Sequence, residues 1–79
     1  MSTAAKAKEK KEFAKKLGQR IKEVRLSKNL TQEQLAHKAG YYRTYVGHIE
    51  TAAYSPSAHT VWRLAKAMDL DPGEFLKGL

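Results

Sequence analysis

Three histidines are the residues with which this chain could most readily perform acid–base or metal chemistry. His37, His48 and His59 fall in separate predicted helices or turns, and none has a partner at ligand spacing. The sequence has no cysteine, which excludes disulfide scaffolds, thiolate zinc sites and thiol catalysis. Glycine-rich phosphate loops follow strands, and no strand is predicted. We therefore expect no enzyme, no metal site and no cofactor.

Basic side chains offer a different chemistry, and they are unevenly distributed. The 79 residues include 15 Lys and Arg against 8 Asp and Glu, a net charge of +7. Residues 1–28 hold ten basic and three acidic residues, which accounts for the whole excess. Such a segment predicts a polyanionic partner, either nucleic acid or an anionic membrane surface. A solvated lysine tail that aids solubility explains the composition equally well.

Five helices are predicted to position these groups, so the fold class is all-α, a single compact domain with short connections. Residues 1–12 form a basic arm, flexible or helical, and residues 13–79 form the domain. No membrane span or signal peptide is expected. The predicted helices run from Phe13 to about Lys28, Gln32 to Ala39, Tyr42 or Arg43 to Thr51, Ser57 to about Asp69, and from Asp71 and Pro72 onward.

Apolar spacing within these helices predicts the core. Phe13, Leu17, Ile21 and Val24 recur at helical intervals, and Val46 and Ile49 point inward from the third helix. In the fourth helix, Trp62 is expected to anchor the core beside Ala58, Val61, Leu64, Ala65 and Met68. Phe75 and Leu76 are expected to point back toward it from the last helix.

The segment from Thr31 to Thr51 combines two helices with a glycine turn. Thr31 and Gln34 form a capping box, and Gly40 supplies a left-handed residue that ends the first helix. The second helix buries only two aliphatic side chains, which leaves most of its surface for solvent or a partner. This is the pattern of a helix-turn-helix unit, whose second helix can enter the DNA major groove.

The sequence resembles the Cro and phage-repressor-like, or XRE-type, helix-turn-helix family over Leu17 to Leu76. Through Arg43-Thr44-Tyr45-Val46 and Ile49-Glu50 it is also similar to a subset of that family, the dimeric controller proteins of restriction-modification systems. The residues that carry the resemblance are Leu17-Gly18-Gln19-Arg20-Ile21, Arg25, Leu30-Thr31-Gln32-Glu33-Gln34-Leu35-Ala36, Gly40, Arg43-Thr44-Tyr45-Val46, Ile49-Glu50, Pro56-Ser57 and Leu64-Ala65-Lys66-Ala67-Met68.

This resemblance implies that the helix around residues 42–51 is the recognition helix. Arg43 and Thr44 then occupy the first base-contacting pair, and His48 lies one turn further along the same face. An arginine here can donate two parallel N–H bonds to guanine O6 and N7. The alternative is a solvated Arg43 that pairs with phosphate or with carbonyl groups of the turn.

Contacts to the DNA backbone are expected from residues around the recognition helix. Gln32 can meet a phosphate at the start of its helix, or it can serve only in the cap. Tyr45 can donate to phosphate or pack in the core, and Gly47 suggests a close approach to a thymine methyl or to backbone. The full set of expected backbone contacts is Gln32, Tyr42, Tyr45, Tyr54, Ser55, Lys6, Lys8, Lys10 and Lys11.

The family pattern also implies a structural role for Arg25 and Glu50, as a partly buried ion pair between the first and third helices. Two departures from the pattern affect the recognition helix. Tyr42 stands where a Ser or Thr cap is usual, and Thr51-Ala52-Ala53 replace the usual glycine after Glu50. The sequence therefore does not determine the backbone path from the third predicted helix into Tyr54 and Ser55.

The sequence thus predicts a DNA-binding transcriptional regulator that binds a pseudo-palindromic operator in double-stranded DNA as a homodimer, in the cytoplasm at the nucleoid. Its partners include neither a membrane nor a small-molecule effector. The C-terminal part, with Phe75, Leu76 and Leu79, is the expected dimer interface. Two alternatives remain: an antitoxin-type module that binds a protein as well as DNA, and a membrane-surface helix over residues 4–28.

Overall fold

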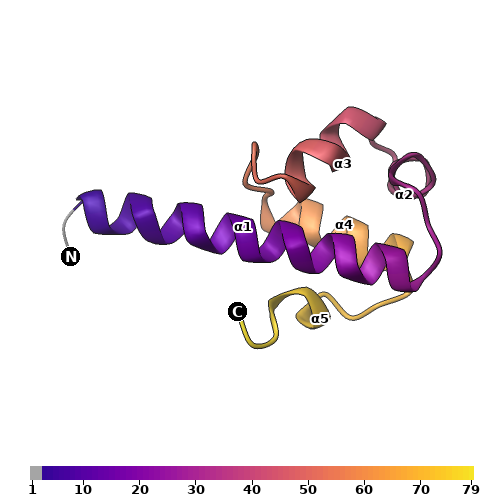
Figure 1. The fold of residues 1–79 in the computed structure, drawn as a ribbon. Coiled ribbons are helices and arrows are strands. Elements are labelled where there is room, and N and C mark those ends of the chain that lie inside the picture. The colour runs from indigo at the N-terminus through magenta and orange to yellow at the C-terminus, as the bar shows by residue number, and fades with distance from the viewer. Residues whose placement is uncertain (1–2) are drawn as a thin grey trace.

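The computed structural model describes residues 3–79, which contain five helices and no strand. The helices are α1 (Thr3–Ser27), α2 (Gln32–Ala39), α3 (Arg43–Glu50), α4 (Ala58–Ala67) and α5 (Gly73–Leu76). The all-α class is therefore confirmed (Figure 1). No helix within the described range is both long enough and apolar enough to cross a bilayer.

Helix α1 begins ten residues before Phe13, where the apolar pattern starts. Residues Thr3–Glu12, here called the N-terminal extension, are helical and exposed along their whole length. Ala, Lys and Glu are strong helix formers, so these residues continue the helix without contributing to the core. The extension projects past the other helices (Figure 1). At the other end, α1 stops at Ser27, and Asn29 adopts a left-handed conformation with φ 57°.

Residues from all five helices form the core. Its fully buried large side chains are Phe75, Ile21, Leu35, Ile49, Leu64 and Val46. Phe75 therefore anchors the core, the role that was expected of Trp62. The Trp62 side chain is 46% exposed. The prediction for Trp62 was wrong because Val61, Leu64, Ala65 and Met68 already form the buried stripe of α4. Trp62 lies one residue off that stripe, about 100° around the helix.

Three other residues expected in the core also lie at the surface. Phe13 is 40% exposed because the buried face of α1 begins one residue later, at Ala14. Leu76 is 46% exposed, since α5 has one turn and buries only Phe75. Ala58 is exposed at the first position of α4. The apolar pattern therefore assigns more residues of α1, α4 and α5 to the core than the structure buries.

Capping residues set the helix boundaries. The Thr31 hydroxyl accepts from the Gln34 N–H at 3.0 Å, and the Gln34 side chain accepts from the Thr31 N–H at 2.8 Å, which confirms the capping box. Ser57 caps α4 as predicted, but α4 ends at Ala67, two residues before the expected boundary. Asp71 accepts from the Gly73 N–H at 2.8 Å, and α5 starts at Gly73 rather than at Pro72.

Candidate nucleic-acid interface

Contacts from α2 and from α4 hold the turn between α2 and α3. Gly40 ends α2 with φ 79°, and the Tyr41 N–H donates to the Ala36 carbonyl at 2.8 Å. Arg63 of α4 donates twice to the Ala39 carbonyl, at 2.9 and 2.7 Å, and its guanidinium lies 5.6 Å from the centre of the Tyr41 ring. The last turn of α2 is therefore fixed to α4. Sequence reasoning assigned no role to Arg63, and no motif signals one.

A buried ion pair joins α1 to the end of α3. Arg25 Nε lies 2.6 Å from Glu50 Oε2, and Arg25 Nη2 donates to Glu50 Oε1 at 3.0 Å. The side chains are 7% and 2% exposed. Arg25 also donates to the Leu30 carbonyl at 2.7 Å, so the pair orders the turn before α2 as well. A charge-assisted, two-pronged bond of this kind fixes orientation as well as distance.

Gln32 completes this network. Its side-chain amide donates to Glu50 Oε1 at 3.1 Å and lies against Gly47, where an added Cβ would meet the Gln32 amide at 3.6 Å. The amide is therefore already engaged with α3. For a phosphate contact, Gln32 offers the backbone N–H groups at the start of α2. An alanine at position 47 would therefore meet the Gln32 side chain at an ordinary contact distance.

Gly18 marks the place where the backbones of α1 and α3 touch. A Cβ at this position would overlap the Ile49 carbonyl oxygen and lie 2.8 Å from that of Glu50. No side chain fits there, so the glycine permits a crossing that determines how α3 sits on α1. A glycine inside an apolar helical pattern is itself a signal of close packing. The family resemblance includes Gly18 but does not imply this role.

The outer face of α3 carries the residues expected to contact bases. Val46, Ile49 and Glu50 are buried, whereas Arg43, Thr44 and His48 are exposed. Arg43 is the first residue of the helix, and Tyr42 before it makes no side-chain cap and is 85% exposed. The structure thus brings Arg43, Thr44 and His48 to the exposed side of one helix, as the family resemblance implies.

The aromatic residues around α3 divide into two groups. Tyr45 is partly buried, its hydroxyl lies 3.1 Å from the Thr60 hydroxyl, and its ring packs edge-on to Tyr41. This is the core-packing alternative for Tyr45. Tyr54 is 52% exposed, and its ring centre lies 4.8 Å from that of His48. Tyr54, in the loop after α3, therefore packs against the ring of His48.

The end of α3 uses an alanine where glycine is usual. Ala52 has φ 65°, in the left-handed region, and the Ala53 N–H donates to the His48 carbonyl at 2.8 Å. The Thr51 hydroxyl donates to the Gly47 carbonyl at 3.1 Å. These bonds close α3 despite the unfavourable backbone of Ala52. They lead the chain into Tyr54 and Ser55, both exposed.

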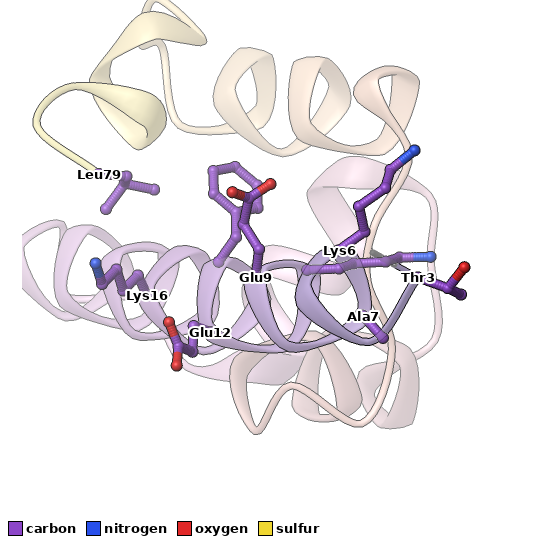
Figure 2. A pocket seen from close by; sticks show the side chains of 9 residues that line it. Thr3, Lys6, Ala7, Glu9, Glu12, Lys16 and Leu79 are labelled. Atoms are coloured by element: carbon purple, nitrogen blue, oxygen red, sulfur yellow. The ribbon is translucent and has the colours of Figure 1, made fainter. Parts of the chain in front are cut away.

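The lysines of the N-terminal extension border two different hollows. Lys10 and Lys11 line one hollow beside Ala52, Ala53 and Ser55. Lys6, Lys10 and Lys16 line the other, together with Glu9, Glu12 and Leu79 (Figure 2). Figure 2 shows Leu79, from the C-terminal tail, opposite the side chains of α1. Lys8 is exposed on α1 and borders neither hollow.

Comparison with known proteins identifies this arrangement. A family model described as Helix-turn-helix matches residues 21–75, which include α2, the Gly40 turn and α3. The chain belongs to the XRE-type helix-turn-helix family of DNA-binding transcriptional regulators. Among the residues that the structure describes, no group of three His, Asp or Glu side chains is placed to hold a metal ion.

Curated members of this helix-turn-helix family with related sequences include phage repressors and control proteins. Control protein C.BamHI of Bacillus amyloliquefaciens is 35% identical over 60 residues, 75% of this chain and 74% of that protein. The immunity repressor protein of Bacillus phage phi105 is 44% identical over 54 residues, 68% of this chain. That match spans 38% of the phage protein.

Solved structures of helix-turn-helix regulators share the fold. The restriction-modification controller protein C.AhdI from Aeromonas hydrophila superposes with a TM-score of 0.77 at 40% identity, covering 78% of this chain and 94% of that one. The controller protein C.Esp1396I superposes with a TM-score of 0.76 at 29% identity, covering 82% and 83%. The resemblance to controller proteins is thus confirmed.

Proposed function

We propose that this regulator binds a pseudo-palindromic operator as a homodimer and reads each half-site with the outer face of α3. One observation carries the proposal. Arg43, Thr44 and His48 are exposed on a helix whose inner face is fixed to α1 and α2 by Glu50. Arg43 donates to guanine O6 and N7, so each half-site contains a G·C pair, while Thr44 and His48 contact neighbouring bases.

Backbone contacts surround this face in the proposed complex. Tyr42, at the start of α3, and Tyr54 and Ser55, after its end, lie on either side of the base-reading residues and are exposed. The N–H groups at the start of α2, around Gln32, supply a further phosphate contact. Tyr45 contributes less than expected, because its hydroxyl is bonded to Thr60. These contacts fix the register of α3 without reading sequence.

Dimerisation follows from the size of the half-site. One recognition helix reads about four to six base pairs, whereas a two-fold dimer places two such helices about 34 Å apart in successive major grooves. Phe75 is fully buried and is removed from the expected interface, which leaves Leu76 and the partly exposed Leu79. The proposal places the protein with the cytoplasmic DNA of the nucleoid and gives it no membrane or small-molecule partner.

Selection of bound sequences from random duplex DNA tests the function and provides the operator. With that operator, the variant Arg43→Ala is expected to lose preference over a scrambled duplex while retaining salt-dependent, non-specific binding. Lys77→Ala, which removes one positive charge from an exposed residue far from α3 in sequence, is the matched control and should keep the preference. Equal loss of Arg43→Ala affinity on both duplexes would reject base readout.

Sedimentation equilibrium tests the oligomeric state. We expect a dimer on the operator, and a weaker dimer when Leu76 is replaced by Ser. A monomer both free and bound to the operator would overturn the homodimer, while leaving the assignment of α3 untouched.

A further inference from the structure

We propose that the hollow between the N-terminal extension and the segment after α3 binds a backbone phosphate of the DNA that α3 reads. Lys10, Lys11 and Ser55 would contact the phosphate. This inference rests on the proposed function and adds a positioned contact from α1, which reaches the same duplex from a second side of the recognition helix.

The chemistry of the hollow favours a phosphate. It measures about 330 Å³ and is lined by Ala7, Lys10, Lys11, Ala14, Ala52, Ala53 and Ser55. Four of these side chains are alanines, so the space is framed by small apolar groups and its polar groups are two ammonium groups and a hydroxyl. No carboxylate lines it. A phosphate oxygen can accept from both lysines and from the serine, the donor types that dominate protein contacts to DNA backbone.

The opposite side of the extension offers a contrast. The hollow of about 790 Å³ beside Leu79 is larger, but its three lysines, Lys6, Lys10 and Lys16, are accompanied by Glu9 and Glu12 (Figure 2). Two carboxylates at the same site repel a phosphate and offset most of the lysine charge. Lys10 borders both hollows, and the smaller one differs in that no carboxylate lines it.

Rigid connections place the smaller hollow relative to the major groove. Ala52 and Ala53 follow α3 directly, and the Ala53 N–H is bonded to the His48 carbonyl, so this wall moves with the recognition helix. The lysine wall belongs to α1, which is continuous from Thr3 to Ser27 and touches the α3 backbone at Gly18. Both walls thus keep a fixed position relative to Arg43.

The continuity of this surface identifies the occupant as DNA. The hollow is lined by the exposed residue Ser55, which follows Tyr54 in the segment after α3. A duplex seated on α3 presents a row of phosphates beyond the bases that are read, and a lysine pair beside α3 meets that charge. An acidic protein segment would require a separate surface, because the same face is covered when DNA is bound.

Neutralisation of single lysines tests this contact. Lys11→Gln is compared with Lys16→Gln, which removes the same charge from the other side of the same helix. We expect Lys11→Gln to weaken binding to the operator and to a scrambled duplex by similar factors, and to reduce the salt slope by about 1 per subunit. In an ethylation-interference experiment, each half-site should show one phosphate fewer at which ethylation impairs binding. Lys16→Gln should leave the footprint unchanged.

Proline tests whether the contact depends on the helix. Glu12→Pro breaks α1 between the lysine wall and the core while keeping every lysine, and Glu12→Ala makes the same charge change in an intact helix. We expect Glu12→Pro to lose the ethylation signal that Glu12→Ala keeps.

Three results would overturn the phosphate contact: an unchanged footprint for Lys11→Gln, equal effects of Lys11→Gln and Lys16→Gln, or equal footprints for the two Glu12 variants. Failure of the proposed function would look different, because the wild-type protein would then show no operator preference and no footprint.

Discussion

The recognition helix α3 and the N-terminal extension of α1 contact the same partner in the proposed complex, but they are built in opposite ways. Helix α3 has eight residues, of which Val46, Ile49 and Glu50 are buried, and it is bonded or packed to α1 and α2. The extension has ten residues, all of them exposed, with four lysines, Lys6, Lys8, Lys10 and Lys11. Packing and hydrogen bonds position α3, whereas the extension is the outward continuation of α1.

This difference separates two parts of DNA binding. Discrimination between bases requires side chains held to within hydrogen-bonding distance, so it depends on the packing beneath α3. Attraction to phosphates is long-ranged and depends mainly on charge. The net charge of +7 lies in residues 1–28, yet the residues proposed to read bases lie in the part of the chain whose charges cancel. The charge distribution therefore indicates what kind of partner binds, and the packing indicates which helix discriminates between bases in the proposed complex.

The ion pair beneath α3 should have the largest effect on stability. Glu50→Ala leaves Arg25 buried without its partner, which typically costs about 3–5 kcal/mol in the free energy of unfolding. Urea denaturation measures the loss, and Glu23→Ala, at an exposed residue of α1, should change stability by less than about 0.5 kcal/mol. A small effect of Glu50→Ala would show that α3 does not depend on this pair.

Replacement of Gly18 and of Gly47 by alanine should change the free energy of unfolding in opposite directions. Gly18→Ala places a Cβ against backbone oxygens of α3 and should lower the free energy of unfolding by about 1–3 kcal/mol. Gly47→Ala meets the Gln32 amide at 3.6 Å, an ordinary contact, and should raise stability by up to about 1 kcal/mol through helix propensity. Denaturation of both variants measures the effects. Equal destabilisation would contradict the specific role of Gly18 at the crossing.

Gly47→Ala also tests how closely DNA approaches α3. If a thymine methyl or the DNA backbone lies against Gly47 in the complex, this variant should bind the operator more weakly although it is more stable. Titration of labelled operator measures this. Unchanged affinity would show that DNA does not lie against Gly47.

The end of α3 should show a smaller effect. Ala52→Gly relieves the left-handed backbone at φ 65° and should raise the free energy of unfolding by about 0.5–1 kcal/mol. Ala53→Gly, at a residue without positive φ, is the control and should not stabilise the protein. Thermal unfolding distinguishes the two variants. A destabilised Ala52→Gly would mean that the methyl group makes a packing contact that offsets the strain.

Local signals in the sequence determined much of the fold. The capping box at Thr31, the stop at Gly40 and the Ser57 cap predict the boundaries of α2 and the start of α4 because these are interactions within a few residues. The exposed position of Trp62 was missed because the side that a helix buries depends on its neighbours. Its own apolar residues leave that choice open.

The candidate site divides in the same way. The family resemblance implied that Arg43, Thr44 and His48 share one face of a helix, and all three are exposed on α3. The roles of Arg63, Gly18 and the Gln32 amide could not be predicted, because their partners are Ala39, the Ile49 and Glu50 carbonyls, and Glu50, all at least 18 residues away in sequence. Contacts between distant segments carry no local pattern that a single sequence reveals.

Removal of residues 1–12 tests most directly the claim that base discrimination belongs to α3 and sequence-independent attraction to the extension. The affinities of the full chain and of residues 13–79 are measured on the selected operator and on a scrambled duplex at several salt concentrations. We predict that both affinities fall and that the salt slope flattens, while the ratio between the two duplexes is retained. A ratio that collapses on deletion, with residues 13–79 still folded, would contradict the account.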